Sequence, residues 1–446
     1  MRSYVPNTAA ERKEMLNSIG FNSIDELFSD IPEKLRLTKE LELDNGKSEI
    51  EIRRIFKAYA ENTNASLPIF RGAGAYRHYI PALIPQIVQR SEFYTAYTPY
   101  QAEMSQGMLQ AIFEYQTLMC NLTGLDVSNA SVYDGATAAA EATNMISAIS
   151  RKSTVLISEG LNPDVRETIC TYARFSQVRI VEIPLNDLGV TDTDALIAEL
   201  DGAAGFLTAS PNYFGNIENM DMLTDIVHRA GALMAAYVNP ISLGMLKRPG
   251  DYNADIAVGD AQPLGLPLSF GGPYCGFICA KQKYLRNLPG RISGLTTDSD
   301  GNRVYVLTLQ AREQHIRRER ASSNICSNQM LCAISASIYL SVMGPQGLRE
   351  VAYTNIQKAH YLAQGMKQIK GIRLRYPDTA FFNEFTVDIN ADPIVVNTLL
   401  RSKGYIGGLI LPARESDKSG MLFCATEMNT REEIDGLLTA IEEVLS

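Results

Sequence analysis

The chain has 446 residues and a mass of 49.1 kDa, with 41 basic and 50 acidic side chains and a net charge of −9. Hydrophobic residues make up 46% and charged residues 20%, which is typical of folded globular proteins and excludes a disordered or fibrous chain. The acidic isoelectric point near 5.2 argues against a nucleic-acid-binding protein. The length predicts two or three folded units.

Sorting signals and metal sites are not expected. Residues 1–6 lack an apolar signal region, and the most apolar stretches, 231–246 and 330–343, are shorter than the roughly 20 residues of a membrane span. The seven Cys fit buried, reduced thiols better than disulfides, and a zinc site would need four ligands at tighter spacing. We therefore expect a cytoplasmic protein without a metal and without a membrane or nucleic-acid partner.

The first 70 residues are predicted to form a helical arm. A capping box at 23–26 should begin a short helix through Phe28, and a second helix is expected over 48–60. A long amphipathic helix then follows over 100–123, and Gly124 ends it.

Strand and helix patterns alternate in the middle of the chain and predict a large α/β domain over 71–325. Asn162 before Pro163 is a helix start, Thr191 begins another helix, and Gly231 ends a third. This alternation indicates a mostly parallel sheet covered on both faces. The predicted strands are 154–157, 178–183, 205–208, 232–238, 255–258 and 276–280.

The pattern changes after about residue 325, which predicts a smaller C-terminal α+β domain over 326–446. Helices are expected over 328–343, 348–369 and 430–445, and strands at 385–388 and 421–424.

Common catalytic signatures are missing. The chain has no dinucleotide-binding glycine pattern, no phosphate-binding Gly-Lys-Ser/Thr loop, no HExxH pair and no Gly-x-Ser-x-Gly. His228, close to a helix end, is expected to be solvated. What remains is a set of strand-end loops at 131–137, 210–215 and 271–273, on the edge where such sheets bind ligands. At the first loop, Asp134 either caps the helix or lies beside a phosphate bound at the helix start, and the residues leave both open.

Longer motifs carry a family resemblance. Residues 94–107 are Tyr-Thr-Ala-Tyr-Thr-Pro-Tyr-Gln-Ala-Glu-Met-Ser-Gln-Gly, and residues 312–319 are Arg-Glu-Gln-His-Ile-Arg-Arg-Glu. Together with 122–126, 129–131, 134–142 and 323–326, they resemble the glycine dehydrogenase (decarboxylating), or glycine cleavage P-protein, family. The resemblance is to its N-terminal half or separate first subunit. It implies the fold type I pyridoxal-phosphate transferase architecture.

Three positions depart from a working pyridoxal-phosphate site of this fold. The resemblance places Pro263 where the lysine that binds the cofactor covalently would stand. Asn239 replaces the aspartate that pairs with the pyridine nitrogen, and Asn162 replaces a stacking histidine. We therefore expect no catalytic residue in this chain alone and a vestigial cofactor pocket.

The resemblance also implies a homologous second subunit that carries the lysine and the pyridoxal phosphate, in a heterotetramer with two of each chain. Ser322, Ser323 and Asn324 would then contact the phosphate of the partner's cofactor. The basic run 312–318 is either part of that interface or a solvated helix face. Interface or channel candidates are Tyr97, Thr98, Tyr100, Gln101, Arg312, His315, Arg317, Gly271 and Gly272.

The implied reaction converts glycine and the oxidised lipoyl arm of the H-protein into carbon dioxide and an aminomethylated carrier. A non-catalytic scaffold or carrier-docking subunit of the same complex is the alternative. A self-sufficient pyridoxal enzyme is disfavoured by Pro263.

Overall fold

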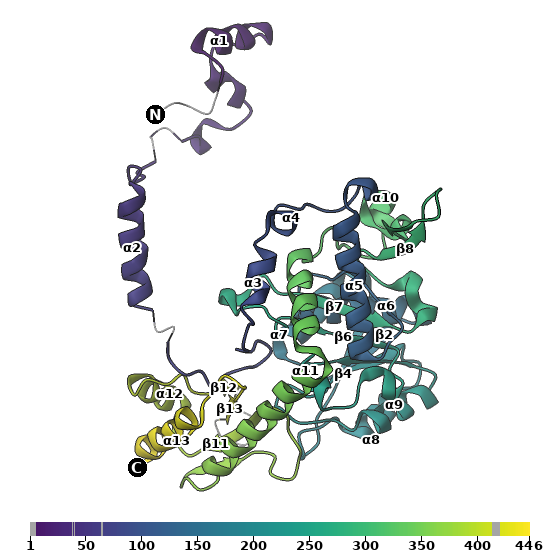
Figure 1. Cartoon of the computed structure of the whole chain (residues 1–446), viewed down its shortest axis with the longest axis vertical. Coiled ribbons are helices and arrows are strands. Elements are labelled where there is room, and N and C mark those ends of the chain that lie inside the picture. The colour runs from purple at the N-terminus through teal and green to yellow at the C-terminus, as the bar shows by residue number, and fades with distance from the viewer. Residues whose placement is uncertain (1–5, 38, 40, 64–65, 413–419) are drawn as a thin grey trace. The chain divides into compact units, whose positions relative to one another are not determined.

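The computed structural model describes residues 6–37, 39, 41–63, 66–412 and 420–446. The chain divides into two compact units, Met1–Ala65 and Ser66–Ser446. The first unit contains α1 (Ala9–Ser18) and α2 (Glu49–Glu61), with short 3-10 helices at Ile24–Phe28 and Glu33–Leu35 between them (Figure 1). The predicted second helix is confirmed, and Ser48 and Glu51 form its capping box. The predicted capping box at Ser23 is wrong, because its side chain makes no bond to the backbone of the helix start.

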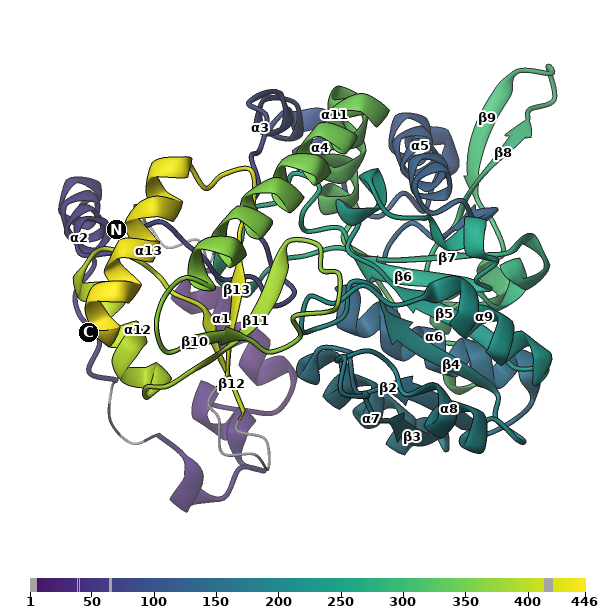
Figure 2. The same cartoon turned by 90° about the horizontal axis from the view of Figure 1, so that it is seen from below.

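The second unit is built on a seven-stranded sheet in the order β1-β7-β6-β5-β4-β2-β3 (Figure 2). β2 to β6 run parallel, whereas β7 is antiparallel to both of its neighbours. The six predicted strands are confirmed, and the two-residue β1 was not predicted. The strands are β1 (Val127–Ser128), β2 (Thr154–Ser158), β3 (Arg179–Ile183), β4 (Gly205–Ala209), β5 (Leu233–Tyr237), β6 (Ile256–Asp260) and β7 (Gly276–Ala280).

Helices cover both faces of this sheet, as the alternating pattern predicts. Successive residues of a strand point to opposite faces, so Phe206 packs in one core cluster with α5 and α9, and Leu207 packs in the other with α6 and α7. The helices are α3 (Leu83–Val88), α4 (Ser91–Tyr94), α5 (Gln106–Thr123), α6 (Gly135–Ser150), α7 (Pro163–Ser176), α8 (Thr193–Glu199) and α9 (Met220–Arg229).

A hairpin and a short helix connect this sheet to the last part of the chain. The hairpin consists of β8 (Ser293–Thr297) and β9 (Arg303–Leu307), and α10 (Gln314–Arg317) follows it. The C-terminal sheet has the order β10-β11-β13-β12 and is wholly antiparallel. The strands of this sheet are β10 (Ile372–Leu374), β11 (Glu384–Ile389), β12 (Leu409–Leu411) and β13 (Gly420–Cys424). The helices of the same part of the chain are α12 (Pro393–Ser402) and α13 (Arg431–Leu445).

The span α11 (Met330–Met366) joins the two sheets and consists of two helical segments that meet at a kink, as the sequence predicts. The backbone is non-helical at Gly344, with φ 60° and ψ −178°, immediately before Pro345, so the helical path is interrupted there and the chain bends. Among the described residues it is the one helix long and apolar enough to cross a membrane. Its first half nevertheless buries Ala333, Ala336 and Tyr339 in the large core.

Three local predictions need correction. The helix predicted over 100–123 begins at Gln106, after a 3-10 helix over Ala102–Met104, and the Gln106 side chain exchanges hydrogen bonds with the backbone of Tyr305 on β9. α8 begins at Thr193 with Asp192 as its cap, two residues later than expected. His228 is not simply solvated, since its Nε2 lies 2.8 Å from the buried Asp255 carboxylate.

The cysteines are free, as expected, but they are not uniformly buried. Cys275, Cys279, Cys332 and Cys424 are buried, whereas Cys326 is exposed and Cys120 and Cys170 are partly buried.

Candidate cofactor and partner site

The start of α6 lies at the carboxyl edge of the large sheet, and two of its backbone N–H groups, those of Gly135 and Thr137, already donate to carboxyl oxygens. Asp134 is the helix cap, and its Oδ1 accepts the Thr137 N–H at 2.7 Å. The Gly135 N–H donates to Oδ2 of Asp260 at 2.8 Å. Of the two interpretations left open for Asp134, the cap is the one that forms, and a carboxylate stands where a phosphate would approach.

Asp260 ends β6 and is 8% exposed. It accepts two further backbone N–H groups, from Gln262 at 2.8 Å and from Cys275 at 3.3 Å. Burial raises its pKa above the usual value, although these hydrogen bonds act in the opposite direction. A Cβ at Gly135 would overlap the hydroxyl of Tyr237, so the space above the helix start is filled by this phenol and the carboxylate.

The turn that contains Pro263 holds another part of the chain instead of a cofactor. The Gln262 amide makes two hydrogen bonds with the backbone of Tyr76, accepting its N–H and donating to its C=O, both at 2.9 Å. The Tyr76 hydroxyl donates to the buried Glu384 at 2.6 Å, and the Ala73 N–H donates to the same carboxyl at 2.6 Å. Burial raises the pKa of Glu384 to about 7.

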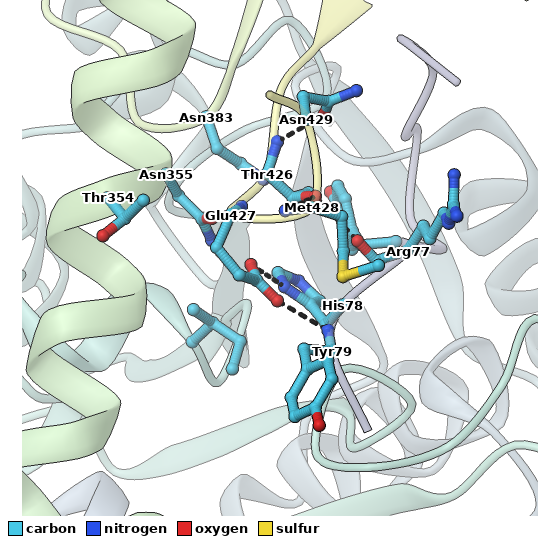
Figure 3. A network of polar contacts seen from close by, with 12 residues as sticks. Arg77, His78, Tyr79, Thr354, Asn355, Asn383, Thr426, Glu427, Met428 and Asn429 are labelled. Carbon is cyan, nitrogen blue, oxygen red and sulfur yellow. Dashed lines mark hydrogen bonds and ion pairs between the residues drawn. The ribbon is translucent and has the colours of Figure 1, made fainter. Parts of the chain in front are cut away.

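The segment around Tyr76 is also fixed to the C-terminal domain (Figure 3). Glu427, after β13, accepts the Tyr79 N–H at 2.6 Å and lies 2.8 Å from Nδ1 of His78. Burial alone would raise the pKa of Glu427, but His78 and the backbone bonds outweigh burial and lower it. The Glu427 N–H in turn donates to Asn355 of α11 at 2.6 Å. The segment therefore joins the large sheet to the small domain.

The other two departures lie at this edge as well. Asn162 caps α7 and donates from Nδ2 to the Ala73 C=O at 2.8 Å. Asn239 accepts the Ile241 N–H at 3.0 Å, and its buried Nδ2 has no partner among the described residues. The lysines nearest in sequence to Pro263 are paired elsewhere, Lys247 with Asp221 and Lys281 with Asp255. These residues do not fit a covalently bound pyridoxal phosphate, because the turn at Pro263 has no amine and the Asp260 side chain lies on the Gly135 N–H at the helix start.

The loop between α10 and α11 contains the residues expected to reach a partner. Ser322 and Asn324 are exposed, whereas Ser323 turns inward and donates to Glu141 of α6 at 2.9 Å. Burial raises the pKa of Glu141 to about 7, against the effect of this hydrogen bond. Ile325 is buried beneath the loop. The loop thus offers two of its three predicted polar side chains to solvent.

Arg291, which the sequence did not single out, connects several of the predicted interface segments. It is 4% exposed, and no carboxylate among the described residues forms an ion pair with it. Its Nη2 donates to the Tyr100 hydroxyl at 2.9 Å and to the Cys326 C=O at 2.7 Å, and Nη1 donates to Asn328 at 3.2 Å. Arg291 precedes β8 in the sequence Arg-Ile-Ser, and no motif there indicates that the arginine would connect distant segments.

The remaining candidates lie in two places, one around Tyr100 and His315 and the other in the loop between β6 and β7. The rings of Tyr100 and His315 lie 6.2 Å apart, so the structure brings their two segments together. In the segment of Tyr100, Tyr97 is 83% exposed, Gln101 is exposed and Thr98 is partly buried. A cavity of about 370 Å³ is lined by Arg286, Arg312, Arg317, Arg320 and Ser322, among others. Gly271 and Gly272 belong to the separate loop between β6 and β7, and both have positive φ.

Comparison with known proteins decides the family. The model of the glycine cleavage system P-protein family matches residues 2–441. A protein named probable glycine dehydrogenase (decarboxylating) subunit 1 from Moorella thermoacetica is 49% identical over the whole of both chains. The corresponding protein of Syntrophomonas wolfei is 50% identical over 98% of each chain. This chain belongs to the glycine cleavage system P-protein family.

Solved structures agree with this family. An inhibitor-bound glycine decarboxylase (P-protein) of the glycine cleavage system superposes with a TM-score of 0.90 at 39% identity, over the whole of both chains. The glutamate decarboxylase of Lactobacillus brevis superposes with a TM-score of 0.67 at 14% identity, which shows the shared fold alone. The fold type I architecture expected from the P-protein resemblance is therefore confirmed. The chain is a subunit of the glycine cleavage P-protein, and the subunit 1 names imply a second subunit.

Proposed function

We propose that this chain is the lysine-free subunit of a two-subunit glycine dehydrogenase (decarboxylating). The complex would convert glycine and the oxidised lipoyl arm of the H-protein into carbon dioxide and an aminomethylated carrier. The homologous second subunit would hold pyridoxal phosphate through its own lysine, in a heterotetramer with two of each chain. When bound there, the cofactor would supply the electron sink for decarboxylation.

The Asp260 carboxylate is the observation that carries this proposal. It accepts the Gly135 N–H at the start of α6. The turn after it contains Pro263 in place of a lysine, and the amide of Gln262 in the same turn is hydrogen-bonded to the backbone of Tyr76. A phosphate at the same place would have to displace the Asp260 side chain from the Gly135 N–H, and the buried carboxyl group would lose that hydrogen bond, which is unfavourable. This supports a cofactor bound by the other chain.

The contribution of this chain to the complex would then be made by its exposed loop. Ser322 and Asn324 can donate hydrogen bonds to an oxyanion of the partner's cofactor, and the bond from Ser323 to Glu141 would fix the loop backbone beneath them. Arg291 holds the far end of the same loop at Cys326 and Asn328.

Chemical trapping tests the central part of the proposal. The isolated chain, incubated with pyridoxal phosphate and borohydride, should yield no stoichiometrically labelled lysine, and glycine decarboxylation should appear only after the second subunit is added. A stoichiometrically labelled lysine in this chain would overturn the proposal.

Alanine substitution separates pocket completion from a pure scaffold. Ser322→Ala combined with Asn324→Ala should weaken cofactor binding by the reconstituted complex about tenfold or more, since each lost hydrogen bond to a charged group costs roughly 1.5–3 kcal/mol. Ser327→Ala, an exposed serine of the same loop, is the matched control and should change nothing. Unchanged cofactor affinity in the double variant would favour the scaffold.

A further inference from the structure

The loop between β6 and β7 carries an aromatic side chain, Phe270, that does not pack in the hydrophobic core of the chain. Phe270 is 106% exposed, more than any other large apolar residue described in the structure. The base of the loop is buried through Leu264 and Leu266, and the Gln262 amide donates to the Leu266 C=O at 2.9 Å. The tip is therefore held out from a fixed base.

The backbone of this tip is strained. Ser269 has φ 45° and Phe270 has φ 56°, a left-handed conformation that L-residues other than glycine and asparagine rarely adopt, and Gly271 and Gly272 continue it with φ 108° and 148°. Three hydrogen bonds keep the conformation: Tyr274 Oη to Leu268 O at 2.9 Å, Gly271 N to Leu268 O at 3.0 Å, and Gly272 N to Ser269 O at 3.3 Å. Strain of this kind collects at functional positions.

We propose that Phe270 is an anchor that inserts into an apolar pocket of the lysine-bearing second subunit. This rests on the proposed function, because it requires that second subunit. An aromatic side chain has few rotatable bonds and loses little conformational freedom when it is buried, and the hydrogen-bonded backbone of this tip holds Phe270 in position for such a contact.

The permanent partner fits this anchor better than a transient one. Interfaces between permanently associated chains are more apolar than those of transient complexes. A carrier protein that must leave after each turnover is expected to meet a more polar surface.

The test compares two exposed phenylalanines in the full-length chain. Phe270→Ala should leave the melting temperature of the isolated chain within about 1 °C of wild type and weaken binding of the second subunit at least tenfold in a calorimetric titration. Phe175→Ala is the matched control, because Phe175 is 81% exposed on the regular helix α7. It should change the affinity less than twofold. Phe270→Leu should restore part of the loss.

Each outcome has one meaning. Wild-type affinity of Phe270→Ala for the second subunit overturns the inference, while glycine decarboxylation by the reconstituted complex would leave the proposed function intact. A loss of self-association or of H-protein binding, with normal second-subunit binding, also overturns it. If the wild-type chain neither binds nor activates a second subunit, the proposed function and this inference fail together.

Discussion

The Asp260 carboxylate accepts three backbone N–H groups from three separate segments, at Gly135, Gln262 and Cys275. It therefore joins the start of α6, the turn after β6 and the start of β7 at one buried point. An ionised or neutral carboxyl group has two oxygens with which to accept these bonds.

Replacing Asp260 by Asn tests this role. The amide has one acceptor oxygen in place of two, so at least one buried N–H loses its partner, and the free energy of unfolding should fall by about 1–3 kcal/mol. Asp134→Asn is the control, since an Asn cap can still accept the Thr137 N–H and should cost under about 1 kcal/mol. Urea unfolding of both variants measures the difference, and equal losses would contradict the proposed role.

Buried carboxyl groups make stability depend on pH. Burial raises the pKa of Glu141, Glu218 and Glu384 to about 7 from an ordinary value of 4.5. Between these values the folded chain keeps protons that the unfolded chain has lost. The free energy of unfolding should therefore fall as the pH rises from about 4.5 to about 7 and then level off.

Glu384→Gln should make the free energy of unfolding fall less between pH 5 and pH 8, because the amide cannot ionise. The difference in the free energy of unfolding between the variant and wild type should shift in favour of the variant by on the order of 1–3 kcal/mol on going from pH 5 to pH 8. Urea unfolding at the two pH values measures this gain, and Glu442→Gln on the exposed face of α13 should show none. An identical pH dependence for Glu384→Gln and wild type would refute the assignment.

At the scale of elements, the bend of α11 depends on one glycine. Gly344 has φ 60° and ψ −178°, a region open essentially only to glycine, and a Cβ there would meet nothing within 4 Å. The cost of a side chain is thus confined to the backbone.

Gly344→Ala should destabilise the chain by about 1–3 kcal/mol. Gly347→Ala, one turn further along the same helix, should be neutral or stabilising by up to about 1 kcal/mol, because its backbone is helical and its neighbour Met343 is flexible. Thermal unfolding of the two variants gives the comparison. A destabilised Gly347→Ala with an unaffected Gly344→Ala would show that the bend is not set by Gly344.

Strand and helix patterns made the large sheet predictable, because buried parallel strands are short apolar runs bounded by helix signals. The hairpin of β8 and β9 was missed, although Asp300-Gly301 between its strands is a typical turn sequence. The start of α5 was placed too early, because Met104, which fits the apolar periodicity, belongs to the 3-10 helix Ala102–Met104 that precedes it. Local periodicity does not distinguish such a 3-10 turn from the first turn of an α-helix.

The site was predictable only in part. The resemblance indicated Pro263, Asn162 and Asn239, and the structure places all three on the strand-end edge of one sheet. Asp260 and Arg291 were missed, since their roles depend on backbone groups far away in the sequence. Ser323 was predicted to face a partner, yet its hydroxyl donates to Glu141.

At the scale of the whole molecule, the second unit has the fold type I architecture, and the strand-end edge of its large sheet is hydrogen-bonded to other segments of the same chain. Segments from both ends of the second unit meet there, with Tyr76 held by Gln262 and Glu384 and His78 beside Glu427. Belonging to the glycine cleavage P-protein family, the chain would act through surfaces that meet a second subunit, while this edge of the sheet serves to hold its two domains together.

The number of cofactors bound per complex shows directly whether this chain holds pyridoxal phosphate. The complex reconstituted from both chains should be titrated with pyridoxal phosphate and followed by absorbance of the lysine-bound cofactor. We expect saturation at one cofactor per pair of different chains, and none bound by this chain alone. Saturation at two per pair, or a bound cofactor in this chain by itself, would contradict this expectation.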